Sequence, residues 1–334
     1  RRRHTRFKCD WSSDVCSSDL CIELKQQGYN VYGIDRRMID HTLQFCDEFV
    51  YDDFSGYDAL SLIKKVKPAA IIHCAGTSLV GPSMHYPEIY FENNVARTNR
   101  MLEFISRHSP NTKVIFSSSA AVYGMPRYYT IDEFDICDPI SPYGESKLMV
   151  EKLLKWYSKC HNVNYVSFRY FNAAGADPES RHGQEPKATH IISKLFEAVM
   201  NDEAFTLYGS SYNTPDGTCI RDYIHVADLA SAHVRAIDSD ITGIYNLGSL
   251  NGTSNLEMQM LVEKITGKEI VTIIQNNREG DPPRLVADST KFKAIAGWVP
   301  SYSVEDIVKD AYKWYQSDTF AKLKTEASRR SPPL

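Results

Sequence analysis

Tyr143 and Lys147, four positions apart in SPYGESK, could act together as a base in alcohol oxidation. A spacing of four places both side chains on one face of a helix. Tyrosine is a weak base at neutral pH because its pKa is ordinarily about 10. An ammonium group about 4–5 Å away would favour the phenolate by roughly 3–4 kcal/mol. The pair therefore predicts a site that removes a hydroxyl proton while hydride leaves the same carbon, although a chance pair is the alternative in a chain with 20 tyrosines.

Serines upstream of this pair make the pattern more specific. VIFSSSAAVYG is typical of an apolar strand that ends in Ser117–Ser119, and sites in α/β proteins lie at the carboxyl ends of strands. A hydroxyl there can hydrogen-bond the reacting oxygen and relay its proton to Tyr143. Turn formation at a strand end is the other interpretation of these serines.

Asp35 ends an apolar strand, YNVYGID, where a carboxylate would bond the adenosine ribose of a dinucleotide. A carboxylate would also repel the 2′-phosphate of NADP, which favours NAD. Arg36 and Arg37 favour NADP instead, or are simply solvated. A further strand ends in HCAG (73–76), whose small residues let a cofactor approach the backbone.

Two arginines in the second half of the chain suit a diphosphate. GTCIRDYIHVADLA contains Arg221, and REGDPPR contains Arg278 and Asp281. A guanidinium group can bond phosphate oxygens bidentately. Ordinary surface charge explains these residues equally well from the sequence alone.

The elements that would position these residues alternate between strand and helix, which predicts a doubly wound parallel sheet of the Rossmann-like α/β class. We expect strands at 29–35, 48–53, 68–76, 113–119 and 163–172, and helices at 57–67, 87–107 and 143–160. The predicted domains are a dinucleotide-binding domain, 1–172, and a smaller mixed α/β substrate domain, 173–334, with a polar C-terminal tail. A segment at about 219–248 is expected to return to the first domain.

Composition excludes several classes of partner. The 334 residues are 43% hydrophobic and 24% charged, as in ordinary globular proteins. The formal net charge of −4 argues against nucleic acid, and no apolar run approaches the ~20 residues that span a membrane. Eight scattered cysteines without CxxC spacing indicate reduced thiols in a cytoplasmic protein, with no metal site.

The N-terminus lacks the glycine-rich phosphate loop that such a fold carries, because the first glycine of the chain is Gly28. RRRHTRFKCDWSSDVCSSDL has no run of β-branched residues and looks like a translated sequencing-adapter read. A divergent native arm is the alternative to a foreign or frame-disrupted start. We expect residues 1–16 to be poorly ordered or off the sheet, with Ser17–Asp19 available to cap the first helix.

From about Cys21 to Trp314, the chain resembles the extended short-chain dehydrogenase/reductase superfamily, and within it the UDP-glucose 4-epimerases. The resemblance rests on IIHCAG, ENNVARTNRML, VIFSSSAAVYG, SPYGESKLMVEK, RYFNAAGADP, DGTCIRDYIHVADLA and REGDPPRLVADSTK. It implies an isomerase that interconverts UDP-galactose and UDP-glucose through a transient 4-keto sugar, with tightly bound NAD. It also implies a homodimer formed through the helices at 87–107 and 143–160.

The resemblance implies a role for each matching residue. Ser119 and Tyr143 would handle the proton, and Lys147 would bind the nicotinamide ribose. Further cofactor contacts would come from Asp35, Asp53, Phe54, Cys74, Ala75, Gly76, Asn94, Ser117, Tyr170 and Phe171. Substrate contacts, besides Ser119, would come from Asn172, His190, Ile191, Thr206, Tyr208, Arg221, Arg278, Asp281 and Leu285.

Alternatives within this resemblance stay open. Leu285, at a position thought to gate room for an N-acetyl group, is of intermediate size, so a UDP-N-acetylglucosamine 4-epimerase is one rival. A UDP-pentose 4-epimerase or a UDP-glucuronate decarboxylase is another. Because the phosphate loop is missing, the chain could also be an inactive remnant that only binds sugar nucleotides.

Overall fold

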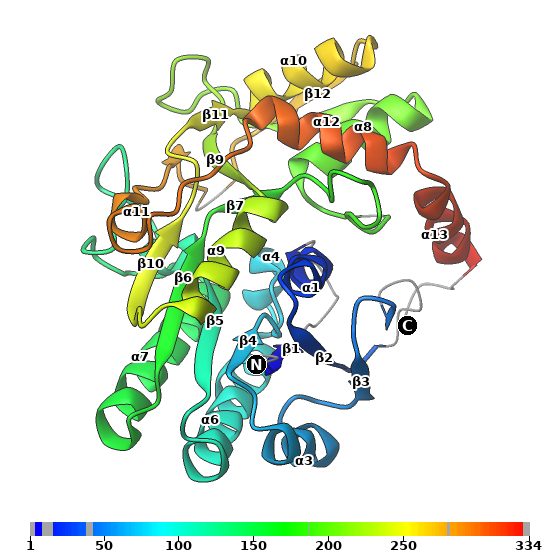
Figure 1. Cartoon of the computed structure of the whole chain (residues 1–334). Helices are drawn as coiled ribbons and strands as arrows, with labels where there is room; N and C mark the ends of the chain where they lie inside the picture. Colours follow the sequence, from blue (N-terminus) through cyan, green and yellow to red (C-terminus); the bar gives the residue numbers. More distant parts are fainter. Residues whose placement is uncertain (1–3, 9–15, 38–42, 187, 279–280, 330–334) are drawn as a thin grey trace.

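The structure, a computed structural model, describes residues 4–8, 16–37, 43–186, 188–278 and 281–329 (Figure 1). The described residues form a large sheet of seven strands in which all neighbours run parallel. From edge to edge these are β10 (Gly243–Leu247), β6 (Tyr165–Tyr170), β5 (Lys113–Ser119), β4 (Ala70–His73), β1 (His4–Lys8), β2 (Asn30–Asp35) and β3 (Glu48–Tyr51). The predicted doubly wound parallel sheet is confirmed.

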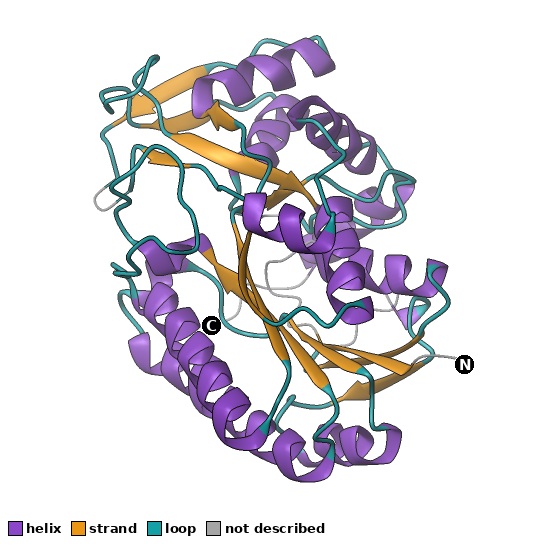
Figure 2. Cartoon of the chain, turned by 60° about the vertical axis from the view of Figure 1, so that its left-hand side comes forward, coloured by secondary structure: helices purple, strands orange, loops and turns teal. Residues whose placement is uncertain are grey.

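Helices cover both faces of this sheet (Figure 2). One layer contains α3 (Tyr57–Val66), α6 (Arg97–His108) and α7 (Pro142–His161), and the other contains α1 (Cys16–Gln26), α9 (Val226–Asp238) and α11 (Thr290–Ala296). Successive strand residues alternate between the layers, so that Val114 packs in the first and Ile115 in the second. Burial on both faces explains the near-continuous apolar runs of the strands.

The helix predicted at 87–107 has three parts. It begins as α5 (Pro87–Tyr90), continues as a π-helical segment, η1 (Phe91–Ala96), and ends as α6. Two short helices lie nearby in the chain, α4 (Val80–Ser83) and the 3-10 helix η2 (Ala120–Tyr123). π-Helical turns are often found at functional sites, and η1 contains Asn94, one of the predicted cofactor contacts.

The expectation that residues 1–16 lie off the sheet is wrong for His4–Lys8. This segment forms β1 between β4 and β2, with Thr5 opposite both Ala70 and Val31. An unfilled gap there would leave two rows of backbone groups without partners, and any extended segment can pair with them. Ser17–Asp19 lie inside α1 rather than before it. Residues 1–3 and 9–15, where a phosphate loop would be expected, lie outside the described residues.

A smaller set of elements lies beyond the carboxyl ends of the large sheet (Figure 1). It has a four-stranded sheet, β7 (Asn172–Ala174), β9 (Ile220–His225), β11 (Gly252–Ser254) and β13 (Arg284–Leu285), and a pair, β8 (Phe205–Tyr208) and β12 (Thr272–Gln275). Its core packs under α8 (Ile191–Asn201), α10 (Asn255–Thr266) and α12 (Val304–Tyr315). The polar C-terminal segment is helical as α13 (Asp318–Arg329), with Phe320 buried beside Trp314.

The segment at 219–248 divides between the two parts. Its strand β9 belongs to the smaller sheet, whereas α9 packs on the large sheet and β10 pairs with β6. The domain boundary at residue 172 stays a prediction.

A buried ion pair fixes α7 to the large sheet. Glu151 of α7 and Arg169 of β6 form a bidentate ion pair. Arg169 Nε lies 3.0 Å from Glu151 Oε1 and Arg169 Nη2 lies 2.7 Å from Glu151 Oε2, and both side chains are under 5% exposed. Ser118 donates to Glu151 at 2.6 Å, and Arg169 donates to the Tyr123 hydroxyl at 2.9 Å. Tyr123 in turn donates to Asn246 of β10 at 2.7 Å. The network therefore joins α7 to three strands.

Removing one charge of this pair should destabilise the fold. We expect Glu151→Gln to lower the free energy of unfolding by about 3–5 kcal/mol, because it leaves a buried guanidinium uncompensated. The matched control is Glu103→Gln, which breaks an exposed pair with Arg107 and should cost about 0.5 kcal/mol or less. Urea unfolding at neutral pH measures both, and equal losses would contradict the structural role of the buried pair.

Candidate functional site

The structure brings Tyr143 and Lys147 together at the start of α7. Gly144 N donates to Ser141 Oγ at 3.2 Å, and Pro142 occupies the first turn, so the helix begins just before Tyr143. Lys147 Nζ lies 5.8 Å from the centre of the Tyr143 ring. The lysine is 5% exposed, and its Nζ donates to the backbone oxygen of Ser117 at 2.8 Å. A buried cation is thus held beside the phenol.

The three serines at the end of β5 point in different directions. Ser118 belongs to the ion-pair network of α7. Ser117 lies on the other side of the strand, where its Oγ donates to Cys74 Sγ at 3.1 Å and lies 2.9 Å from the Tyr170 hydroxyl. Ser119 Oγ accepts from Ala121 N at 3.2 Å and is half-buried. Ser117 and Ser119 are therefore the serines placed for site chemistry.

The other predicted cofactor residues lie at the carboxyl ends of adjacent strands. Asp35 ends β2, Cys74–Gly76 follow β4, and Tyr170 and Phe171 end β6. Such an edge is where open α/β sheets bind their ligands. The Asp35 carboxylate is 2% exposed and accepts from Arg37 N at 2.8 Å.

Asn94 of η1 holds the turn after β4 close to α7. Its Oδ1 accepts from Thr77 N at 2.7 Å, and its Nδ2 donates to Thr77 O at 3.0 Å and to Ser146 Oγ at 2.9 Å. Gly76 has a φ of 155°, and a Cβ there would lie 2.8 Å from Asn94 Oδ1. Only glycine allows this close approach. Asn94 therefore fixes the turn after β4 against α7.

Asp53 and Phe54, which the resemblance assigns to the cofactor, both contact other residues of the protein. Asp53 bonds Arg97 Nη1 at 2.6 Å and Ser55 Oγ at 2.7 Å. Phe54 is 6% exposed and packs against His73, with ring centres 4.9 Å apart. Their contacts with a cofactor stay predictions.

The predicted substrate residues line two adjoining cavities in the smaller part of the protein. The first, about 250 Å³, is lined by Asn172, His190, Ile191, Arg221, Arg278 and Asp281 among others. The second, about 460 Å³, is lined by Thr206 and Tyr208 and shares Ile191, Arg278 and Asp281 with the first. Leu285 lines neither and instead packs against the cluster that contains Phe171 and Tyr123.

Charge and stacking organise these cavities. Arg221 forms an ion pair with Asp281, and the Arg278 guanidinium lies 4.0 Å from the centre of the Tyr208 ring. The first cavity also contains Gln184, Thr189 and Asn255, which the sequence analysis missed. No local signal marked them, since Asn255 simply follows Ser254 in a capping box.

His233, also missed from the sequence, holds Tyr170 from α9. Its Nδ1 lies 2.7 Å from the backbone oxygen of Leu229, and its Nε2 lies 2.6 Å from the Tyr170 hydroxyl. Because a carbonyl only accepts, Nδ1 carries the hydrogen, and Nε2 of the neutral ring accepts a hydrogen bond from the Tyr170 hydroxyl. Burial lowers the pKa of His233 to about 4. A neutral histidine therefore orients Tyr170 toward Ser117.

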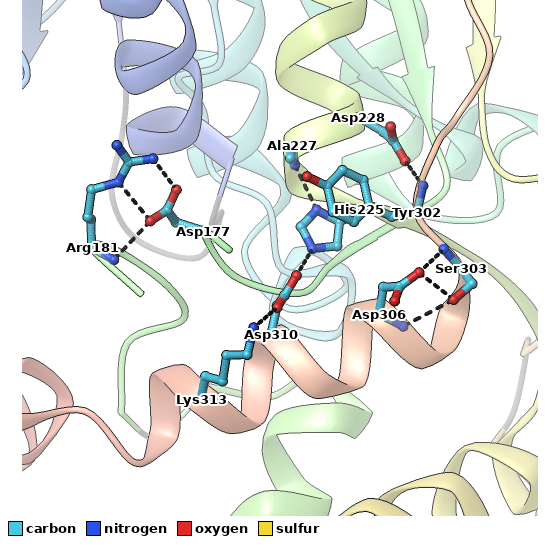
Figure 3. Close-up of polar contacts among 10 residues, drawn as sticks. All are labelled: Asp177, Arg181, His225, Ala227, Asp228, Tyr302, Ser303, Asp306, Asp310 and Lys313. Carbon is cyan, nitrogen blue, oxygen red and sulfur yellow. Dashed lines mark hydrogen bonds and ion pairs between the residues drawn. The ribbon is translucent and has the colours of Figure 1, made fainter. Parts of the chain in front are cut away.

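A second buried histidine, His225, joins the start of α9 to α12 (Figure 3). Its Nδ1 accepts from Ala227 N at 3.0 Å, its Nε2 lies 3.4 Å from Asp310 Oδ2, and Tyr302 stacks on the ring with centres 4.1 Å apart. Burial lowers its pKa to about 4 despite the nearby carboxylate. Nδ1 caps the start of α9 and Nε2 faces Asp310 of α12, so we place His225 in the scaffold.

The described residues contain no cluster of three or more His, Cys, Asp or Glu side chains placed to hold a metal ion. Among the same residues, no helix has the length and apolar character that crossing a membrane requires.

Comparison with known proteins assigns the family. Residues 16–248 match the NAD dependent epimerase/dehydratase family. The chain belongs to this family. It is 36% identical over 309 residues to a UDP-glucose 4-epimerase of Lactobacillus helveticus, covering 88% of the chain and 92% of that relative.

Solved structures agree with this assignment. A UDP-glucose 4-epimerase from Brucella ovis in complex with NAD superposes with a TM-score of 0.87 at 33% identity, over 93% of this chain and 98% of that one. One from Bifidobacterium longum, in complex with NAD⁺ and UDP, gives 0.85 at 31% identity, over 95% and 99%. This family member thus shares its fold with enzymes whose structures contain the predicted cofactor.

The buried histidines should make stability depend on pH. A histidine of this kind has a pKa near 4 in the folded protein and near 6.5 in the unfolded chain. Between pH 4 and pH 6.5 it therefore binds a proton mainly in the unfolded chain. The free energy of unfolding is therefore highest above pH 6.5 and falls as the pH drops toward 4. His233 accounts for about 3 kcal/mol of this loss. Urea unfolding at pH 7 and pH 4.5 measures this slope.

The variant His233→Gln should reduce that slope by about half, because an amide oxygen can accept from Tyr170 but does not titrate, whereas His225 still does. His85→Gln, which changes an exposed histidine, is the control and should leave the slope unchanged. A slope as steep in His233→Gln as in the wild-type protein would contradict the assignment.

Proposed function

We propose that this chain is a UDP-glucose 4-epimerase, an isomerase that interconverts UDP-galactose and UDP-glucose in galactose metabolism with tightly bound NAD. The observation that carries the proposal is the buried Lys147 ammonium beside Tyr143 and the β5 serines. It occurs in a chain that covers 92% of a UDP-glucose 4-epimerase.

The residues at the carboxyl edge fit NAD. Asp35 offers a buried carboxylate at the end of β2, suited to ribose hydroxyls. Cys74, Ala75 and Gly76, which follow β4, are small residues that let a cofactor approach the backbone. NAD, when bound, supplies the acceptor for hydride from C4 of the sugar. Lys147 would hold the nicotinamide ribose.

The chain's own residues would handle the proton. Tyr143, beside a cation that burial shields from water, takes the proton of the 4-hydroxyl group. Ser119 lies at the same strand end and would hydrogen-bond the reacting oxygen. The bond from Lys147 to the Ser117 backbone fixes the ammonium, so its charge acts on the phenol without reorganisation. Return of hydride to the other face of the 4-keto sugar, together with return of the proton from Tyr143, would complete the cycle.

The nucleotide half of the substrate would occupy the two cavities. Arg221 and Arg278 provide guanidinium groups for the diphosphate. The Tyr208 ring lies against Arg278 and, with Thr206, would border the uracil. Asp281 holds Arg221 in place through their ion pair.

We also propose a cytoplasmic homodimer. Apolar side chains stay exposed on the helices that the resemblance assigns to the dimer, with Ile89 44% exposed and Trp156 62% exposed. Covering them would remove apolar surface from water. Six cysteines are free thiols, which suits a reducing compartment: Cys21, Cys46, Cys74, Cys137, Cys160 and Cys219.

Cofactor content tests the proposal directly. Purified protein should release about one NAD per chain on denaturation, because a cofactor regenerated in each turnover need not leave. Asp35→Ala should lower this content at least tenfold through loss of the ribose contact, whereas Asp58→Ala, at an exposed position, should not change it. Protein that contains no NAD and turns over neither UDP-galactose nor UDP-N-acetylgalactosamine nor UDP-arabinose would overturn the proposal.

Tyr143→Phe should lower kcat by roughly 10²–10⁴-fold, the usual contribution of a general base, while UDP binding changes by less than about tenfold. Tyr157→Phe is the control on the same helix and should keep kcat within about twofold. Rates of UDP-galactose conversion and UDP titrations measure both effects. A wild-type rate in Tyr143→Phe would remove Tyr143 from the reaction.

A further inference from the structure

A pair of cysteines outside the site joins α1 to the segment before β3. The Sγ atoms of Cys21, on α1, and Cys46 lie 3.9 Å apart. Cys21 is 2% exposed and Cys46 is half-buried. Cys21 belongs to the core under α1 and Cys46 packs against it, and the proposed reaction involves neither sulfur.

The neighbouring residues hold the two sulfurs in register. Asp47 N donates to Val31 O at 2.8 Å, and Val31 N donates to Asp47 Oδ2 at 2.7 Å. Lys25, one turn after Cys21 on α1, bonds the other oxygen of Asp47 at 2.6 Å. Cys46 is thereby fixed opposite Cys21 by contacts on both sides.

A glycine leaves room for the Cys46 sulfur. A Cβ at Gly33 of β2 would lie 3.0 Å from Cys46 Sγ, closer than side chains normally pack. The hydrogen bond with Cys21 lowers the pKa of the Cys46 thiol, although burial opposes this. Because thiolates are the reactive form, the more accessible member of the pair is also the better nucleophile.

We propose that Cys21 and Cys46 form a reversible disulfide when the protein meets a hydroperoxide. The Cys46 thiolate attacks the peroxide, so that an S–O bond forms, the O–O bond breaks and an alcohol or water leaves. The Cys21 sulfur then attacks the sulfenic sulfur of Cys46, an S–S bond forms, and water leaves with the proton. Two thiols lose two electrons, and the hydroperoxide gains them.

Bond formation requires the two sulfurs to approach from 3.9 Å to about 2.05 Å. Cys46, the half-buried member of the pair, has the more accessible side chain. The disulfide would close a loop that runs from α1 through β2 to Cys46 and includes Asp35. Oxidation would therefore tie α1 covalently to the segment that follows β2.

Peptide mapping of the whole chain tests the proposal without using NAD or turnover, so its outcome is independent of the proposed function. Native protein is treated with hydrogen peroxide, its thiols are alkylated in denaturant, and a non-reducing tryptic digest is analysed by mass. Trypsin leaves Cys9, Cys16 and Cys21 in one peptide, so Cys9→Ser/Cys16→Ser serves as the background variant. The expected product joins Cys21 to Cys46, at least tenfold above any other pair, and dithiothreitol removes it.

Two comparisons complete the design. In Cys21→Ser, Cys46 has no resolving partner and should label with dimedone at least fivefold more than in the background variant. Cys160→Ser, which removes an exposed thiol, should leave the Cys21–Cys46 yield unchanged. Pairing spread evenly over the cysteines, as in urea-unfolded protein, or equal dimedone labelling with and without Cys21, would overturn the proposal.

Discussion

The position of α7 depends on one buried interaction, the ion pair between Glu151 and Arg169. Burying two charges is costly unless each finds several hydrogen bonds, and here Ser118 and Tyr123 provide them. Glu151 lies about one turn after Lys147 on α7, and its partner Arg169 lies on β6, whose end carries Tyr170. Through it, the phenol and the ammonium of the site are held against the strands that carry the serines and the predicted cofactor contacts.

Much of the fold could be predicted because its signals are local. Apolar runs marked the strands, and a spacing of four placed Tyr143 and Lys147 on one side of α7. The roles of the three serines could not be assigned, because their environment depends on Glu151, 33 positions after Ser118. The contact between Tyr170 and His233 spans 63 positions. It exists only because α9 returns to the large sheet.

The N-terminal segment shows how side-chain propensity can mislead. RRRHTRFK carries no pattern of a buried strand, yet β1 fills the centre of the sheet. The backbone groups of β2 and β4 face each other across that gap, and their pairing does not depend on side-chain type. Strand propensity mainly reflects how well side chains pack on a sheet. It therefore predicts little for a segment whose position is fixed by backbone pairing with β2 and β4.

The two cavities in the smaller part of the protein show a second balance of charge. Arg221 and Arg278 both face the space between α8 and β9, where two uncompensated guanidinium groups would repel each other. Asp281 pairs with Arg221, and the Tyr208 ring lies against Arg278. Each guanidinium group is therefore held in position before an anion binds. Because a guanidinium group has five N–H donors, neither Asp281 nor Tyr208 uses all the donors of its arginine. Such preorganisation favours a diphosphate, which can take the remaining donors without first ordering the side chains.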